Sequence, residues 1–282
     1  MQETWVRILT KPFDGTRQRN YASRTILKIA TWNVNSLAVR LPQLLDWLAL
    51  HRPDALCLQE TKLTDDKFPH AAITAAGYRV QWFGQKTYNG VALISRSVAT
   101  DVVCNIPGRD DPQARVIAAT VDGVRIVGIY VPNGQSVESE KFPYKLAWLA
   151  ALREWIAKEM AAHPQLALLG DYNIAPEDRD VHDPVTWAGQ VLCTPEERAH
   201  FKGLLALGLH DSFRLFEPGP KHYSWWDYRM LGFQKNKGLR IDHILVSEAL
   251  KARVTSCVID RPTRKNQRPS DHAPVICELT SD

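Results

Sequence analysis

Residues 166–173, Leu-Ala-Leu-Leu-Gly-Asp-Tyr-Asn, form an apolar run that ends in polar residues. A short continuous apolar run of this kind is typical of a strand that is buried on both faces. Leu27-Lys28-Ile29-Ala30-Thr31-Trp32-Asn33 and Ala55-Leu56-Cys57-Leu58-Gln59-Glu60 also predict strands that end in polar side chains. The three stretches together indicate an α/β core with polar groups at the strand ends.

Helical patterns accompany these strands. Apolar residues within 41–48 recur at i, i+3, i+4 and i+7, with Pro42 expected in the first helical turn. A second helical pattern covers residues 149–160, and Thr194-Pro195-Glu196-Glu197 is a capping box that opens a third helix to about Leu207. The helices are therefore expected to pack on a sheet.

Further strands and tight turns complete the prediction. Asn89-Gly90 and Asp122-Gly123 are typical hairpin turns. The strand candidates around them are residues 78–83, 90–96, 114–121 and 125–131, and the last third returns to strands near Tyr223, Ile241, Val258 and Ile276. Mixed strands with outer helices predict an α/β sandwich of two packed sheets, formed as one domain by residues 27–282.

Composition narrows the class of protein. The 282 residues are 45% hydrophobic and 23% charged, as in a soluble globular protein. No apolar run reaches the ~20 residues that span a bilayer, and residues 1–26 lack a signal-peptide core, so an intracellular protein is expected. Residues 1–26 predict a poorly ordered extension; a start-site artefact or a transit peptide are the alternatives. Five cysteines without a CxxC pair indicate neither a disulfide framework nor a zinc knuckle.

Charge is unevenly distributed although the net charge is only +4. The segments 229–240 and 261–268 each carry four basic residues and no acid, whereas residues 171–183 hold five acids and one arginine. Two basic loops beside an acidic centre suit a polyanion held over a metal site. The alternative for each basic loop is an ordinary solvated surface.

Arg268-Pro269-Ser270-Asp271-His272-Ala273-Pro274 places a carboxylate and an imidazole together between two prolines. Neighbouring side chains on an extended backbone point to opposite faces, so each group needs a partner elsewhere. For His272 we expect Asp242, an acid in the otherwise apolar stretch Leu239-Arg240-Ile241-Asp242-His243-Ile244-Leu245. Such a carboxylate orients an imidazole and raises its pKa. The alternative is a core histidine with a structural hydrogen bond.

Polar side chains recur at the ends of buried-looking strands, and convergence on one rim would give them a shared use. They are Asn33, Glu60, Asp171, Asn173, Asp242, Asp271 and His272. Oxygen ligands from Glu60, Asn33 and Asp271 suit Mg²⁺ or Mn²⁺. The chain has no HExxH, P-loop, GxGxxG or GxSxG motif, which disfavours zinc, nucleotide-driven and acyl-transfer chemistry.

Seven blocks of residues, in order, resemble the motifs of the exonuclease III family of DNA-repair nucleases. The blocks are Trp32-Asn33-Val34-Asn35, Leu58-Gln59-Glu60-Thr61-Lys62, Tyr130-Val131-Pro132-Asn133-Gly134, Gly170-Asp171-Tyr172-Asn173, Ser224-Trp225-Trp226-Asp227-Tyr228-Arg229, Gly238-Leu239-Arg240-Ile241-Asp242 and Ser270-Asp271-His272-Ala273-Pro274. The resemblance runs from about Leu27 to the C-terminus. It implies a four-layered, DNase I-like α/β sandwich and a Mg²⁺-dependent phosphodiesterase. Family members incise DNA at abasic sites, digest strands 3′ to 5′ and remove 3′ blocking groups.

The resemblance also implies roles for individual residues. Glu60 would bind the metal ion with help from Asn33 and Asp271. Asp171 would orient or deprotonate the attacking water, and Asn173 would hold the nucleophile or the phosphate. A carboxylate near the water and a cation near the phosphate are a chemically sensible division.

On the phosphate side, the resemblance implies that His272, charged through its pairing with Asp242, donates to the phosphate oxygen that gains charge. Tyr130 would hydrogen-bond the same phosphate. Imidazolium and hydroxyl donors stabilise developing negative charge on oxygen.

The predicted DNA contacts lie in two motifs of the last third. Trp225 with Leu239 and Ile241 resembles the pocket that receives an extruded abasic sugar, since an apolar pocket suits a sugar without its base. One of the neighbouring tryptophans, Trp225 and Trp226, is expected to serve the core, because neighbours on a strand face opposite ways. Arg229 and Arg240 are expected to contact DNA.

His182 departs from the family pattern, because abasic-site endonucleases of this family often carry a small residue there. An imidazole at this position would obstruct continuous duplex while tolerating a strand end. The hypothesis is that exonuclease and 3′-phosphatase activities outweigh internal incision. The alternative is a histidine on a surface loop.

Other classes remain as alternatives. Members of the superfamily cleave inositol phosphates, sphingomyelin or RNA tails, and a non-catalytic nucleic-acid-binding module would keep the basic loops but lose metal or dyad residues. None of those residues is lost. The expected protein is therefore a monomeric cytoplasmic enzyme, in a bacterial nucleoid context, that acts on double-stranded DNA with abasic sites or 3′ ends.

Overall fold

Two six-stranded mixed sheets form the centre of the protein. The computed structural model describes residues 26–280, so the predicted extension over residues 1–26 lies outside the described residues except for Ile26. In order across it, the first sheet contains β11 (Val254–Ile259), β12 (Val275–Thr280), β1 (Ile26–Asn33), β2 (Ala55–Gln59), β4 (Val91–Ser95) and β3 (Arg79–Phe83). The second contains β5 (Thr100–Cys104), β6 (Val116–Val121), β7 (Val124–Tyr130), β8 (Leu166–Asp171), β10 (Asp242–Ser247) and β9 (Leu209–Asp211).

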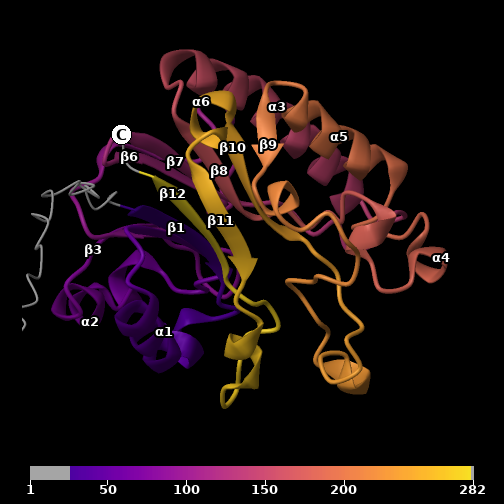
Figure 1. Ribbon diagram of the computed structural model, residues 1–282, viewed down its shortest axis with the longest axis horizontal. Helices are drawn as coiled ribbons and strands as arrows, with labels where there is room; N and C mark the ends of the chain where they lie inside the picture. Colours follow the sequence, from indigo (N-terminus) through magenta and orange to yellow (C-terminus); the bar gives the residue numbers. More distant parts are fainter. Residues whose placement is uncertain (1–25, 281–282) are drawn as a thin grey trace, which may run out of the picture.

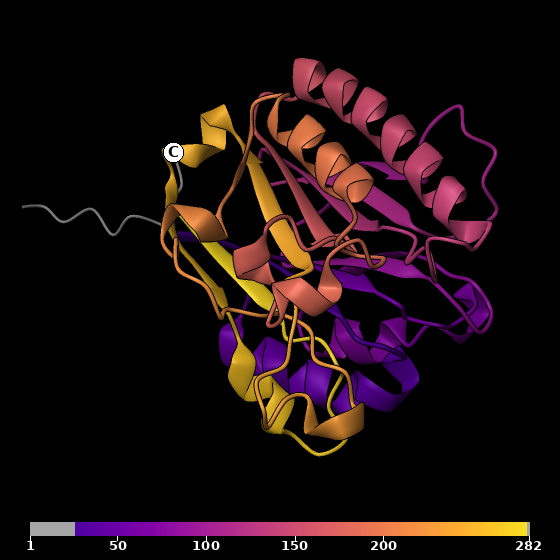
Figure 2. The same cartoon turned by 90° about the vertical axis from the view of Figure 1, so that its right-hand side faces the viewer.

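Helices cover the outer face of each sheet, as Figures 1 and 2 show. α1 (Leu37–His51) and α2 (His70–Ala75) lie on the first sheet, and α3 (Lys141–Ala162) and α5 (Pro195–Leu205) lie on the second. Separate apolar clusters fill the space between the sheets and beneath each pair of helices. The four-layered α/β sandwich is therefore confirmed. No helix of residues 26–280 is long and apolar enough to cross a membrane.

Short helical segments lie in the connections. They are α4 (Pro184–Trp187), α6 (Glu248–Lys251), and the 3₁₀ turns η1 (Asp65–Lys67), η2 (Asp178–Asp180), η3 (Phe213–Leu215), η4 (Arg229–Leu231) and η5 (Arg261–Lys265). Figure 1 shows α4 and the loop around η4 projecting from the same side of the sandwich. Trp187 of α4 and Arg229 and Met230 of η4 line a cavity that is described below.

The two sheets share one pairing pattern. Each has a central parallel pair, β1 with β2 and β7 with β8, and all of its other pairs are antiparallel. A parallel pair needs a long crossover, which α1 and α3 supply. The carboxyl ends of the central strands therefore lie at one rim. The sheets approach closely at Gly128, where a Cβ atom would lie 2.7 Å from Sγ of Cys57.

Some of the predicted secondary-structure elements agree with the structure and others do not. Asp122-Gly123 is the two-residue turn of the β6–β7 hairpin, with φ of 48° and 79°. The prediction of a strand near Tyr223 was wrong, because only isolated β-bridges at Trp225 form there. Pro42 lies inside α1 rather than in its first turn, since the helix begins at Leu37. Pairing and helix starts depend on neighbouring segments that periodicity does not describe.

Candidate active site

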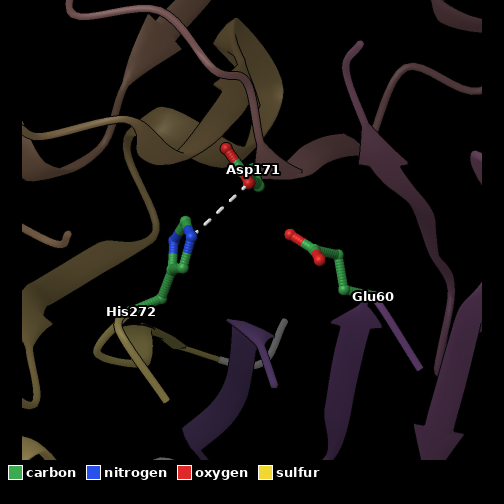
Figure 3. Close-up of side chains that lie close together, drawn as sticks. All are labelled: Glu60, Asp171 and His272. Carbon is green, nitrogen blue, oxygen red and sulfur yellow. Dashed lines mark ion pairs between the residues drawn. The ribbon is translucent and has the colours of Figure 1, made fainter. Parts of the chain in front are cut away.

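Three ionisable side chains meet at the rim where the central strands end. Glu60 follows β2, Asp171 ends β8, and His272 precedes β12. One ligand atom from each lies within 4.8 Å of the others, and Figure 3 shows the three side chains facing one another. The predicted convergence of polar strand ends is thus observed for these residues.

His272 is held between two carboxylates. Its Nδ1 atom lies 2.9 Å from Oδ2 of Asp242, as the sequence predicted, and its Nε2 atom lies 3.8 Å from Oδ2 of Asp171. Burial opposes the charged ring, but the charges of Asp242 and Asp171 outweigh it and raise the pKa of His272 to about 10. The ring therefore carries a positive charge at neutral pH and points Nε2–H at Asp171.

Asp171 is buried, and its oxygens accept several hydrogen bonds. Nδ2 of Asn33 donates to Oδ2 at 2.9 Å, and the backbone N–H of Asn173 donates to Oδ1 at 2.9 Å. Burial raises the pKa of Asp171 to about 7, although the charge of His272 and these hydrogen bonds lower it. A carboxyl group that titrates near neutral pH is well matched to exchanging a proton with water.

Glu60 is the more accessible of the two carboxylates in the cluster. Its side chain is 19% exposed, Oε1 accepts a 2.8 Å hydrogen bond from Nδ2 of Asn33, and Oε2 lies 2.9 Å from Nζ of Lys62. Asn33 therefore joins Glu60 to Asp171 through one amide group. Its Oδ1 atom accepts the N–H of Asn35 instead of facing Glu60.

Asp271 is held outside this cluster. Its Oδ1 atom accepts from Nδ2 of Asn35 at 2.9 Å, and its Oδ2 atom accepts from Nε1 of Trp225 at 3.0 Å. Asp271 and His272 diverge as expected for neighbours on an extended chain. The part of Asp271 and Asn33 in metal binding stays a prediction.

The cluster fits a divalent cation of the Mg²⁺ type. Glu60 offers partly exposed carboxylate oxygens, whereas His272 is paired through Nδ1 and charged, which makes it a poor ligand. Oxygen-rich sites of this kind suit Mg²⁺ and Mn²⁺ rather than zinc. A metal ion bound here would lie beside the Asp171–His272 pair.

Tyr130 and Asn173 border the cluster. Burial, with the carboxylates of Glu60 and Asp171, raises the pKa of Tyr130 well above its usual value, so the hydroxyl stays neutral and can donate. The guanidinium of Arg115 lies 4.8 Å from the Tyr130 ring centroid. The carboxamide of Asn173 donates to the carbonyl of Val131 at 3.0 Å and accepts from Nδ2 of Asn133 at 3.1 Å.

The predicted DNA contact at Arg240 was wrong. Arg240 is 1% exposed, and its guanidinium binds Asp180 at 2.6 Å, Asp211 at 2.7 Å and Nδ1 of His243 at 2.9 Å. A buried cation with these partners cannot reach a phosphate. Arg229, by contrast, is exposed beside Asp227, and its contact with DNA stays a prediction.

The apolar pocket differs from the prediction in its walls. Leu239 and Ile241 are 0% and 2% exposed, so they support the pocket from behind and do not line it. Trp226 is fully buried, as one of the two tryptophans was expected to be, whereas Trp225 faces a cavity of about 370 Å³. His182 borders the same cavity, with Nδ1 lying 3.2 Å from the carbonyl of Gly238.

Three residues of the site carried no predicted role. Lys62 pairs with Glu60, Asn35 orients Asn33 and Asp271, and Oγ of Ser270 donates to the carbonyl of Asn33 at 2.6 Å. All three lie within two residues of a predicted site residue inside the quoted motifs. Their positions inside these motifs could have marked them as site residues, but the sequence did not indicate which groups they would bind.

Comparison with known proteins supplies the family. A model of the Endonuclease/Exonuclease/phosphatase family matches residues 30–272. The chain belongs to this family. Exodeoxyribonuclease III of Haemophilus influenzae is 36% identical over 266 residues, which cover 90% of this chain and 100% of that protein.

Solved structures of family members agree with the fold. The 3′ phosphatase NExo from Neisseria, bound to a product DNA hairpin, is 53% identical with a TM-score of 0.89, covering 90% of this chain and 100% of that one. An AP endonuclease from Archaeoglobus fulgidus is 36% identical with a TM-score of 0.87, covering 91% and 100%. The predicted family is confirmed, and the chain is a hydrolase of the exodeoxyribonuclease III type.

Proposed function

We propose that this family member is a Mg²⁺-dependent DNA-repair nuclease that removes nucleotides and phosphate groups from 3′ ends of duplex DNA and incises at abasic sites. The observation that carries the proposal is the position of His272 between Asp242 and Asp171 beside Glu60. This arrangement supplies a proton acceptor, a cation and a metal-ligand carboxylate around one point. Each of these functions lowers the barrier to hydrolysis of a phosphodiester.

In the proposed reaction, water attacks phosphorus and the bond from phosphorus to the 3′ oxygen breaks. Asp171 accepts the proton of the water, and Asn173 orients the water or the phosphate. The charged His272 donates to a phosphate oxygen, with Tyr130 as a second donor. Asp242 keeps the imidazole charged and correctly turned.

Glu60 would hold the metal ion, assisted by Asn33 and Asp271. Bound there, Mg²⁺ or Mn²⁺ would stabilise the negative charge that develops on the phosphate. The oxygen-rich cluster and the partly exposed carboxylate of Glu60 support this assignment.

DNA as the substrate is supported by the relatives. NExo is described with a product DNA hairpin, and the Archaeoglobus protein is described as an AP endonuclease. In this chain, Arg229 and Lys237 border the cavity next to the site and would contact a strand through its phosphates. A monomeric state and a cytoplasmic location near the bacterial nucleoid stay predictions.

End processing without efficient internal incision is the second candidate. His182 borders the cavity that Trp225 faces, where a continuous strand would need space. The 53% identity to a 3′ phosphatase favours this candidate. It gives His182 the role of obstructing internal abasic sites.

The test compares a duplex with an internal abasic analogue and a duplex with a recessed 3′-phosphate, each with Mg²⁺ and with chelator. Metal-dependent cleavage of both supports the general nuclease. Release of the 3′-phosphate alone supports the end-processing enzyme, and His182→Gly should then raise internal incision relative to phosphate release. No turnover of either substrate would favour a nucleic-acid-binding module, and an unchanged ratio in the variant would remove His182 from the explanation.

A further inference from the structure

A cavity of about 370 Å³ adjoins the catalytic rim. Trp225 forms part of its wall, pairs with His272 in an isolated bridge and donates through Nε1 to Asp271. Trp187, in α4, forms another part of the wall. Trp225 therefore connects the cavity to the residue with the charged imidazole, and two indoles border the cavity.

The position of Trp187 is fixed by its short helix and by the core. Asp183 caps α4 by accepting from the backbone N–H of Thr186 at 3.2 Å and from its hydroxyl at 2.7 Å. The Trp187 ring lies edge-to-face with His182, with centroids 6.4 Å apart. Both Trp187 and Trp225 pack against one apolar cluster, which contains Leu239, Ile241, Ala175, Val181, Leu192 and Cys193. The buried cluster thus holds both indoles at the cavity.

We propose that this cavity binds the base of the 3′-terminal nucleotide while that nucleotide is being removed, and that Trp187, by stacking on this base, favours nucleotide removal over removal of a 3′-phosphate. The inference rests on the proposed nuclease function. Aromatic side chains stack on any nucleobase, so such a site tolerates all four. Arg229 is paired with Asp227 at the rim, and Lys237 leaves the rim with a net positive charge that matches the negative charge of the strand.

The size of the cavity indicates on which side of the scissile phosphate the bound nucleoside lies. Ligand cavities of roughly 300–1,000 Å³ hold small molecules, so about 370 Å³ suits one nucleoside. On the 5′ side of the scissile phosphate the strand continues into duplex, which the cavity cannot hold. On the 3′ side, exonuclease action leaves one nucleotide, and this nucleotide fits.

The proposal separates two reactions at one catalytic centre. Removal of a nucleotide places a base on the 3′ side of the phosphate, whereas removal of a 3′-phosphate leaves nothing there. Trp187 should therefore contribute more to nucleotide removal than to phosphate removal. A role confined to folding would affect both reactions alike.

The experiment measures kcat/KM of the full chain on two duplexes that differ only in a recessed 3′-hydroxyl or 3′-phosphate terminus. For Trp187→Ala we expect the ratio of nucleotide removal to phosphate removal to fall about ten-fold to a hundred-fold, as loss of one base stack implies. Trp187→Phe, which keeps an aromatic face, should restore most of the ratio. Val185→Ala, on the same helix at an 88% exposed position, should leave the ratio at the wild-type value.

A third duplex ends in an abasic residue in place of the terminal nucleotide, and its cleavage should be much less sensitive to Trp187→Ala. Equal losses on all three duplexes, or a phenylalanine variant as defective as the alanine variant, would overturn the proposal. If the wild-type chain cleaves none of the duplexes, the proposed function itself is wrong. That outcome is distinct from an active enzyme whose ratio does not respond to Trp187.

Discussion

Nε2 of His272 lies 3.8 Å from Oδ2 of Asp171, on the side of the ring that faces away from Asp242. This gap separates a charged donor from a proton acceptor whose pKa is about 7. Opposite charges at this distance stabilise each other when both are buried. The pair therefore supplies acid and base functions at one point, and Asp242 keeps the imidazole charged.

Asp242→Asn should lower kcat about 100-fold or more, because the amide has no negative charge to raise the pKa of His272. Without that carboxylate the ring loses its proton at a lower pH. The defect should therefore grow between pH 6 and pH 9, measured as kcat on a 3′-phosphate duplex. Asp46→Asn, at an exposed position of α1, is the matched control. A defect of the same size at every pH would show that Asp242 only orients the ring.

Glu60→Gln and Lys62→Met should shift the metal requirement in opposite directions. Removing the charge of Glu60 weakens cation binding, whereas removing the ammonium that lies 2.9 Å from Oε2 relieves competition with a cation. The Mg²⁺ concentration for half-maximal rate should rise for Glu60→Gln and fall for Lys62→Met, each by about ten-fold or more. Shifts of the same sign would exclude Lys62 as a competitor of the metal ion.

Glu197→Ala should unfold the protein at much lower urea concentration. Glu197 and Lys145 are both fully buried and ion-paired, and Nζ of Lys145 also donates to the carbonyls of Asn173 and Asn133. Removing the carboxylate leaves an unpaired buried cation, which costs about 3–5 kcal/mol of unfolding free energy. Glu196→Ala, at the exposed neighbouring position, should change it by less than about 0.5 kcal/mol.

Equal unfolding free energies for the two alanine variants would show that the Lys145–Glu197 ion pair does not stabilise the fold. Comparing the kcat values of the two variants would then show whether the ion pair positions Asn173 for catalysis.

Acidification should destabilise the protein through His243. Burial, with the charge of Arg240, lowers the pKa of His243 from 6.5 to about 4. Below pH 6.5 this histidine is protonated in the unfolded chain, whereas in the folded chain it stays neutral down to about pH 4. The free energy of unfolding therefore decreases as the pH falls from 6.5 to 4. The contribution is at most about 3 kcal/mol.

Urea denaturation at several pH values measures this effect. His243→Gln also offers one acceptor and one donor, for Arg240 and for the carbonyl of Ile174, but does not titrate. Its stability should depend less on pH between 6.5 and 4. An identical pH dependence in both proteins would assign the loss to other groups.

The sequence by itself determined the strand ends, the α/β class and the family motifs. A short apolar run is enough to indicate a buried strand. Asp242 was an acid within such a run and therefore needed a partner. Its pairing with His272 was predictable because a buried carboxylate without one is costly. The Asp122-Gly123 turn was predictable because its positive φ angles favour these residues.

Only the tertiary structure decided the partners of the remaining side chains. Asn33 donates to Asp171 across 138 residues of sequence, and Arg240 sits in a basic stretch yet is buried among carboxylates. Trp187 reaches the cavity from a four-residue helix that no periodicity indicates. Residue type and hydrophobic periodicity are local properties. Which charge is buried, and against what, depends on how distant segments pack, and that is settled only when the two sheets and their connecting loops come together.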